Sequence, residues 1–220
     1  MTLIMFDMDG TLIDTHSLIA DHMATAFEEV GLAAPSGAES RRVIGLSLPV
    51  AMARLAGSDD PELIERLTET YKTHYRASLV TGDSREGLFP GALDALARLG
   101  TRADTLMGIA TGKGLQGVNR ILALHDIAGH FATLQTPDHN PSKPHPGMLM
   151  RAMGETGAAP HEVVMIGDTI FDIEMGKAAG AFAIGVSWGY HDPAELVAAG
   201  ADILIERYDE LDAAIDQLLE

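Results

Sequence analysis

The second half of the sequence alternates short apolar runs with segments of helical spacing, and this alternation constrains the fold more than any other feature. From Pro90 onward, buried-strand patterns at 106–110 and 163–166 are each followed by a segment with the spacing of a helix. Strands that alternate with helices indicate parallel βαβ units. We therefore predict an α/β fold with a three-layer, Rossmann-like parallel sheet.

A further buried strand is expected at 3–6, far from the others along the chain. Residues 15–80 carry no strand pattern and have helical spacing, with a first helix that ends at Gly31 and further helices at about 39–56 and 60–80. We interpret this stretch as an all-helical insertion after the first strand. The predicted units are a core of residues 1–14 and 84–220 and a cap of residues 15–83, with hinges near 14–16 and 82–87.

The composition limits the partners of the chain. It has 220 residues, no cysteine, and 15 basic against 32 acidic residues, for a formal charge of −17. Nucleic acid and anionic membranes are poor partners, because a polyanion needs clustered cations and the sequence has no basic run. The N-terminal apolar run ends after four residues at Asp7 and is no signal peptide, and no run is long enough to cross a bilayer. We expect a cytoplasmic protein that acts on a small molecule.

Carboxylates follow two of the predicted strands. The first strand ends at Asp7 and Asp9, and the strand at 163–166 is followed by Asp168, with Asp172 one helical turn further on. Ligands of open parallel sheets bind at the carboxyl ends of the strands, so these acids should meet at one edge. Like charges held this close need a cation, and oxygen ligands suit Mg²⁺.

Other polar residues are expected at the same edge. The strand at 106–110 ends at Thr111 and Gly112, and Lys143 lies in the proline-rich loop NPSKPHPG. Prolines restrict the backbone of that loop, so the ammonium group of Lys143 could be aimed at the carboxylates, where it would also neutralise a phosphate.

Four ordered segments of the chain resemble the motifs of the haloacid dehalogenase-like hydrolases: DMDGT at 7–11, the hydroxyl residue Thr111, the KP pair at Lys143, and GDTIFD at 167–172. The helical insertion lies where that superfamily places its cap. Within the superfamily, the chain is most similar to the phosphoglycolate phosphatase and β-phosphoglucomutase branch. The resemblance implies a Mg²⁺-dependent phosphatase for a small phosphorylated metabolite.

The resemblance also implies roles for the acidic residues. Asp7 would be the nucleophile that forms an aspartyl-phosphate, and Asp9 would act as general acid and then as general base. The Mg²⁺ ion would be held by the carboxylates of Asp7 and Asp168 and by the backbone carbonyl of Asp9. Asp172 would act indirectly, by orienting metal-bound water or Lys143.

Phosphate and substrate contacts are implied for a second group of residues. The Thr111 hydroxyl, the neighbouring Gly112 amide and Lys143 would hold the phosphoryl oxygens, although this branch commonly has asparagine where Gly112 stands. Arg42, in the cap, would bind a second anion of the substrate, and Lys113 would have an anchoring role. Among the histidines, His22 is expected to pack in the cap. The histidines expected at the surface are His139, His145 and His191.

Three other functions stay open. A β-phosphoglucomutase-like phosphotransferase would share all these residues. A 2-haloacid dehalogenase also uses an aspartate at a strand end, but Asp9 and the metal-binding set argue against it. A receiver-like phospho-switch combines an acidic cluster with a lysine, but its phosphorylated aspartate is expected well into the chain and without an adjacent acid.

Overall fold

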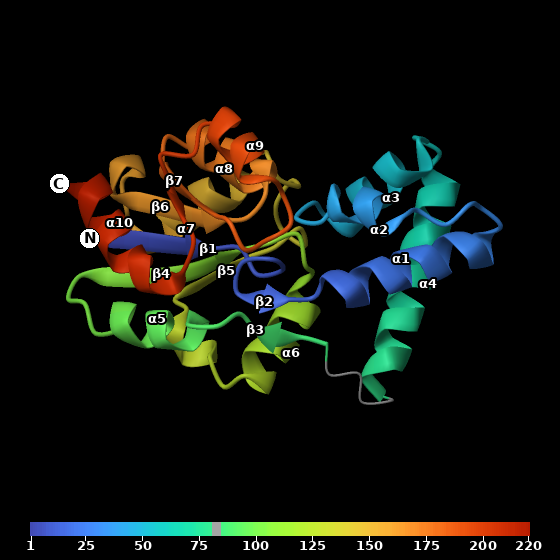
Figure 1. Ribbon diagram of the computed structural model, residues 1–220, viewed down its shortest axis with the longest axis horizontal. Coiled ribbons are helices and arrows are strands. Elements are labelled where there is room, and N and C mark those ends of the chain that lie inside the picture. Colours follow the sequence, from blue (N-terminus) through green and yellow to red (C-terminus); the bar gives the residue numbers. More distant parts are fainter. Residues whose placement is uncertain (81–84) are drawn as a thin grey trace.

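A six-stranded parallel sheet lies at the centre of the computed structural model, which describes residues 1–80 and 85–220 (Figure 1). The strand order is β5–β4–β1–β6–β7–β8, so β1 has β4 on one side and β6 on the other. The carboxyl ends of these three strands therefore meet at one edge of the sheet. The strands are β1 (Thr2–Phe6), β4 (Thr105–Ala110), β5 (Thr133–Gln135), β6 (Val163–Gly167), β7 (Phe182–Val186) and β8 (Ile203–Ile205).

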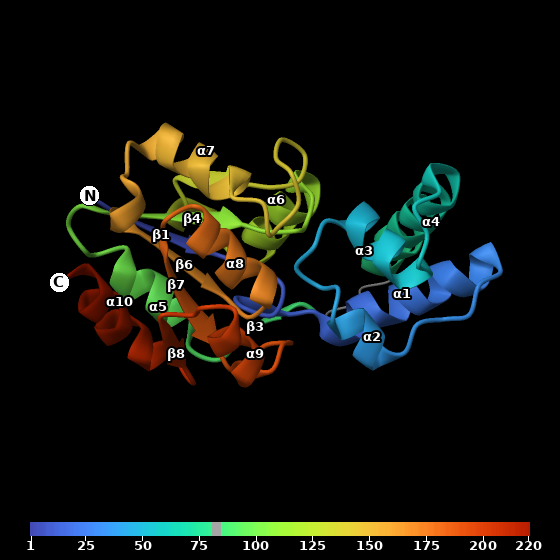
Figure 2. The ribbon, with the colours of Figure 1, turned by 90° about the horizontal axis from the view of Figure 1, so that it is seen from above.

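Helices cover both faces of the sheet, which confirms the predicted three-layer α/β fold (Figures 1 and 2). Successive side chains of β1 point to opposite faces: Ile4 and Phe6 pack in one core cluster, Leu3 and Met5 in another. The first face is covered by α5 (Ala92–Leu99), α6 (Leu115–Leu124) and α10 (Leu211–Leu219), and the second by α7 (Gly147–Thr156), α8 (Ile170–Ala178) and α9 (Pro193–Ala198).

The described residues between β2 and β3 form four helices, which we call the helical block (Figure 2). They pack around an apolar cluster that also includes Phe171 and Tyr190 of the core. The helices are α1 (His16–Val30), α2 (Gly37–Arg41), α3 (Leu48–Ala56) and α4 (Pro61–Val80). The prediction of one helix over 39–56 is wrong, because Gly45 takes a φ of +99° and the chain turns before α3 begins. Among the described helices, none has the length and apolar character of a membrane span.

A small antiparallel pair, β2 (Ile13–Asp14) and β3 (Gly87–Leu88), joins the helical block to the core. The Phe89 amide extends the pair by donating to the Leu12 carbonyl at 2.9 Å. The sequence did not predict these strands, since two residues are too few to show a period. Part of the predicted second hinge, including Gly82, lies outside the described residues.

Candidate active site

The carboxyl end of β1 places Asp7 in the interior, fully buried between β4 and β6. Its backbone amide donates to the Ile166 carbonyl at 2.9 Å. Lys143, itself 2% exposed, sets its Nζ 2.9 Å from Asp7 Oδ1 and 2.5 Å from Asp172 Oδ1. Among the described residues, Asp7 Oδ2 has no hydrogen-bond partner. A buried carboxylate thus keeps one oxygen available beside a fixed cation.

Asp168, after β6, is the second fully buried carboxylate of the site. Its Oδ1 accepts a hydrogen bond from Thr11 Oγ1 at 2.8 Å, and its Oδ2 accepts one from the Tyr190 amide at 2.9 Å. Gly10 and Gly189 pack against it so closely that a Cβ atom at either position would lie within 2.2 Å of Asp168. Both glycines are therefore needed for this packing.

The third buried acid, Asp172, is occupied by protein partners. Its Oδ1 pairs with Lys143, and its Oδ2 accepts hydrogen bonds from the amide and the hydroxyl of Thr169 at 3.0 and 2.7 Å. The Thr169–Asp172 pair also forms the capping box that begins α8. Asp172 accordingly contacts Lys143 through one oxygen and Thr169 through the other, and its indirect role stays a prediction.

The three carboxylates could hold a cation together. Asp7, Asp168 and Asp172 each offer an oxygen, and these oxygens lie within 4.8 Å of one another. Burial raises the pKa of Asp7 to about 7, against the attraction of Lys143, and burial and the charge of Asp7 raise the pKa of Asp168 well above its usual value. Both shifts express the cost of burying ionised carboxylates close to one another. The unpartnered Asp7 oxygen and the all-oxygen donor set fit Mg²⁺.

Asp9 lies on the side of the site that faces the helical block and is 7% exposed. Its Oδ1 accepts a hydrogen bond from Thr15 Oγ1 at 2.8 Å and lies 3.3 Å from Lys113 Nζ. Burial alone would lower the pKa of Lys113, but the nearby Asp9, Tyr75, Tyr71 and Glu86 together outweigh burial and the pKa is raised. The expected anchoring role of Lys113 thus takes the form of an ion pair with Asp9.

Thr111 and Gly112 follow β4, beside the end of β1. Thr111 is buried, and its Oγ1 accepts a hydrogen bond from the Lys113 amide at 3.3 Å. The 43–47 loop of the helical block covers Gly112: a Cβ atom there would lie 2.3 Å from the Leu46 carbonyl oxygen and 2.6 Å from that of Gly45. The helical block is therefore closed onto the core at this point.

The structure thus brings most of the predicted site residues to one edge of the sheet. They are Asp7, Asp9, Thr111, Gly112, Lys143, Asp168 and Asp172. Arg42 does not join them. Its side chain is 66% exposed, and Nη2 pairs with Glu195 Oε1 at 3.0 Å, so the expected contact with a substrate anion is wrong in this structure.

Two histidine predictions have different outcomes. His22 packs in the helical block as expected, edge-on to Tyr71 and Tyr75. His191 was expected at the surface but is only 6% exposed, because it packs on the Phe171 ring and its Nδ1 accepts a hydrogen bond from the Ile170 amide at 3.2 Å.

The sequence indicated no site role for Thr15, and for Tyr190 it left open a place at the site mouth or in the packing. Besides its amide contact with Asp168, Tyr190 accepts a hydrogen bond from the Thr15 amide through its hydroxyl at 2.9 Å, and so links the start of the helical block to the core. Tyr190 follows the strand that ends at Val186, so it lies at the same edge of the sheet as the other site residues. That position favours a site role, but the segment Trp188-Gly189-Tyr190 is equally consistent with packing.

A cavity of about 580 Å³ opens beside Asp9 and Gly112, between the helical block and α6. Its remaining wall is mostly apolar on the side of the helical block. The cavity therefore reaches the site at Asp9 and Gly112.

Comparison with known proteins gives a consistent picture. Residues 4–186 match the family described as haloacid dehalogenase-like hydrolase. A protein of Dickeya dadantii named probable phosphatase IndB is 33% identical, covering 99% of this chain and 95% of its own length. A phosphoglycolate phosphatase of Nitrosococcus oceani is 30% identical, covering 99% and 93%. The crystal structure of a hydrolase from Pseudomonas syringae is 25% identical and covers 100% of both chains with a TM-score of 0.87.

Proposed function

Because this chain belongs to the haloacid dehalogenase-like hydrolases, we propose that it is a Mg²⁺-dependent phosphatase that hydrolyses a small phosphorylated metabolite through an aspartyl-phosphate on Asp7. The observation that carries the proposal is the buried Asp7 carboxylate, whose Oδ2 has no hydrogen-bond partner among the described residues while Lys143 stands 2.9 Å from Oδ1. A free carboxylate oxygen beside a fixed ammonium group suits attack on an anionic phosphoryl group.

The carboxylates of Asp7 and Asp168 and the backbone carbonyl of Asp9 would hold the Mg²⁺ ion, whose charge would neutralise the phosphoryl oxygens. Asp172 has both oxygens engaged and serves to hold Lys143. Lys143, the Thr111 hydroxyl and the backbone amide of Gly112 bind the phosphoryl oxygens and set the phosphorus in line with Asp7.

The reaction then has two halves. In the first, an Asp7 oxygen bonds to phosphorus, the ester P–O bond breaks, and Asp9 gives a proton to the leaving oxygen, which departs as the alcohol. In the second, water attacks phosphorus, Asp9 takes back a proton from that water, and the bond between Asp7 and phosphorus breaks. Inorganic phosphate leaves, and both aspartates return to their starting states.

The relatives support a phosphatase, since both of those named above are phosphatases, 30% and 33% identical, that span nearly the whole chain. Only one of the two is named for a substrate, so the relatives support the reaction but not a particular substrate. The identity of the alcohol that carries the phosphate depends on the cavity between the helical block and α6.

The experiment compares phosphate release from phosphoglycolate, acetyl phosphate and p-nitrophenyl phosphate, with Mg²⁺ and with a chelator. We expect Mg²⁺-dependent release, its loss in Asp7→Asn, and its retention in the control Asp94→Asn, which removes an exposed acid of α5. Mass spectrometry of rapidly quenched protein should find one added phosphoryl group in the wild type and none in Asp7→Asn. Release that persists in Asp7→Asn, or no release from any ester, would overturn the proposal.

A further inference from the structure

The cavity beside Asp9 offers an apolar wall to whatever is attached to the phosphate. On the side of the helical block, the stacked rings of Tyr71 and Tyr75, with centroids 6.2 Å apart, form part of this wall. The core side includes Asp9, residues 112–117, Arg120 of α6 and residues 137–138. Further apolar residues of the wall on the helical block include Ile19, Met23, Val43, Ile44, Leu46 and Leu48.

The size of the cavity argues against a very small alcohol. Its 580 Å³ would hold roughly 20 water molecules at the volume per molecule of liquid water, and it lies within the range of pockets that enclose whole drug-sized ligands. A glycolate group would fill only a small part of it. The rest would remain as apolar surface facing water, so a small substrate would gain little from the helical block.

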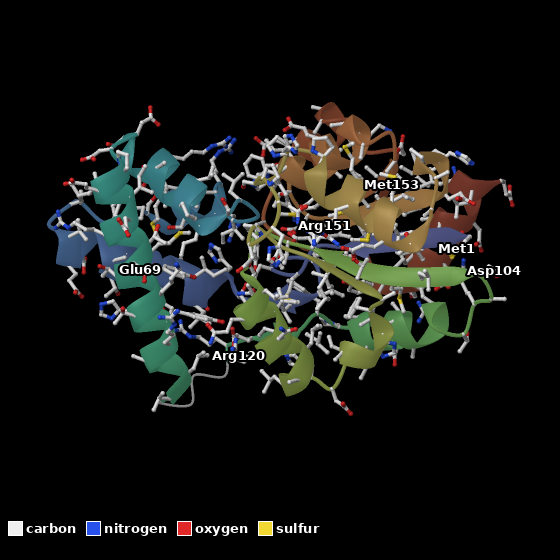
Figure 3. All side chains as sticks on the ribbon, turned by 180° about the vertical axis from the view of Figure 1, so that it is seen from behind. Met1, Glu69, Asp104, Arg120, Arg151 and Met153 are labelled. Atoms are coloured by element: carbon white, nitrogen blue, oxygen red, sulfur yellow. The ribbon has the colours of Figure 1, made fainter. Side chains whose placement is uncertain are left out.

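The charges around the cavity argue against an anionic leaving group. Lys113 pairs with Asp9, Arg120 pairs with Glu86 at 2.5 Å, and Lys72 pairs with Glu69 at 2.7 Å. Figure 3 shows Arg120 at the junction of the two units and Glu69 on the helical block. Among the described residues, three of the four lining cations are thus paired with carboxylates and the fourth, Arg76, is exposed to solvent, so a second anion would gain less here than beside a buried, unpaired cation, in a protein of net charge −17.

We propose that the substrate is a phosphate monoester of a bulky, uncharged alcohol whose ring or chain packs against Tyr71, Tyr75 and the apolar wall, rather than an ester of a small hydroxy acid or an inorganic phosphate. This inference rests on the proposed function and narrows it to one class of alcohol. The products are inorganic phosphate and the free alcohol, and water is the only co-reactant.

The test compares kcat/KM for three esters of primary alcohols with Mg²⁺ present: 2-phenylethyl phosphate, ethyl phosphate and phosphoglycolate. Phenylethyl and ethyl phosphates have leaving groups of similar intrinsic reactivity, so their ratio isolates the contribution of the ring. Burial of a phenyl group predicts a preference of roughly tenfold or more over ethyl phosphate. Equal or higher kcat/KM for ethyl phosphate or phosphoglycolate would overturn the inference.

A substitution tests whether the preference comes from this cavity. Leu48 is partly buried at the start of α3 and lines the cavity. Leu48→Trp should therefore fill part of the cavity and lower the phenylethyl-to-ethyl ratio of kcat/KM at least threefold, which is roughly the square root of the expected tenfold preference. The control Met150→Trp adds the same side chain at a position that is 60% exposed on α7 and should leave the ratio unchanged. A ratio unchanged in a folded Leu48→Trp variant would overturn the inference.

A measurement on the wild-type protein covers the case in which Leu48→Trp does not fold. The product 2-phenylethanol should inhibit competitively at concentrations at which ethanol and glycolate do not, and its failure to do so would count against the inference. Failure of the proposed function looks different, because then no ester, p-nitrophenyl phosphate included, would be hydrolysed. Hydrolysis of the esters without a higher kcat/KM for 2-phenylethyl phosphate would support the phosphatase function and contradict only the proposed substrate class.

Discussion

Replacing Gly112 with asparagine should impair catalysis, although asparagine is common at this position in the branch that the chain resembles. A Cβ atom at Gly112 would lie 2.3 Å from the Leu46 carbonyl oxygen, and real Cβ contacts are essentially never shorter than 3.0 Å. The obstacle is backbone rather than a flexible side chain, so the 43–47 loop must retreat. The backbone of Gly112 is not left-handed, and the effect is therefore steric.

The size of the effect follows from this displacement. Moving the Leu46 carbonyl from 2.3 Å to an ordinary contact distance of at least 3.4 Å shifts the wall of the cavity by about 1 Å or more, and misplacement on the order of 1 Å can cost about a hundredfold in rate. We expect kcat/KM to fall by roughly that factor in both Gly112→Asn and Gly112→Ala. The free energy of unfolding should fall as well, because the apolar cluster of the helical block includes Phe171 and Tyr190 of the core and a displaced block would loosen those contacts.

The assay is steady-state kinetics with p-nitrophenyl phosphate, together with a crystal structure of the variant to locate the 43–47 loop. Gly37→Asn is the matched control, since it lies on α2 of the helical block with no atom within 4 Å of its Cβ position. An asparagine variant as active as the wild type, or clearly more active than the alanine variant, would show that a side-chain donor to phosphate matters more than loop closure. Either result would refute the steric reasoning.

Three further predictions concern the site and its surroundings. Asp9→Ala should slow both half-reactions by roughly a hundredfold or more, measured by single-turnover and steady-state kinetics, and near-normal turnover would remove its role as acid and base. Mg²⁺ at about a hundredfold above its Kd should stabilise the wild type by about 2.7 kcal/mol in thermal unfolding, and an equal shift in Asp168→Ala would contradict the assigned ligand. Glu86→Gln should lower the free energy of unfolding by about 1–3 kcal/mol in a urea titration, because Glu86 is 2% exposed and pairs with Arg120. The side chain of Arg120 is 29% exposed, so water partly replaces the lost ion pair and keeps the decrease in this range. An unchanged urea midpoint would rule out this contribution.

The sheet and the cluster of acids could be predicted because both depend on local patterns. Val163–Gly167 is a continuous apolar strand, and the rule that parallel strands end at one edge places Asp168 near Asp7 without further information. The rule needs only the direction of the strands and their neighbours. The rule gives no distances, so it could not show that Asp172 Oδ1 pairs with Lys143 or that Asp172 Oδ2 accepts a hydrogen bond from Thr169.

Other features depend on contacts between residues far apart in the sequence. Arg42 pairs with Glu195, 153 positions away, and nothing near Arg42 indicates that direction. The burial of His191 arises from the Phe171 ring, which a single histidine in a loop does not reveal. The break near Gly45 was missed because the helical spacing on either side of it is continuous, and one glycine inside such a pattern does not by itself end a helix.

The pairing of Asp14 with Gly87 has a consequence for how such a protein can diversify. Paired residues of antiparallel strands lie about 5 Å apart, so the chain enters and leaves the helical block through adjacent positions. A segment attached in this way can be exchanged for one of another length or shape without displacing any strand of the central sheet. A graft between Asp14 and Gly87 would replace the part of the cavity wall that the helical block supplies, and Asp7, Lys143 and Asp168 lie outside the exchanged segment.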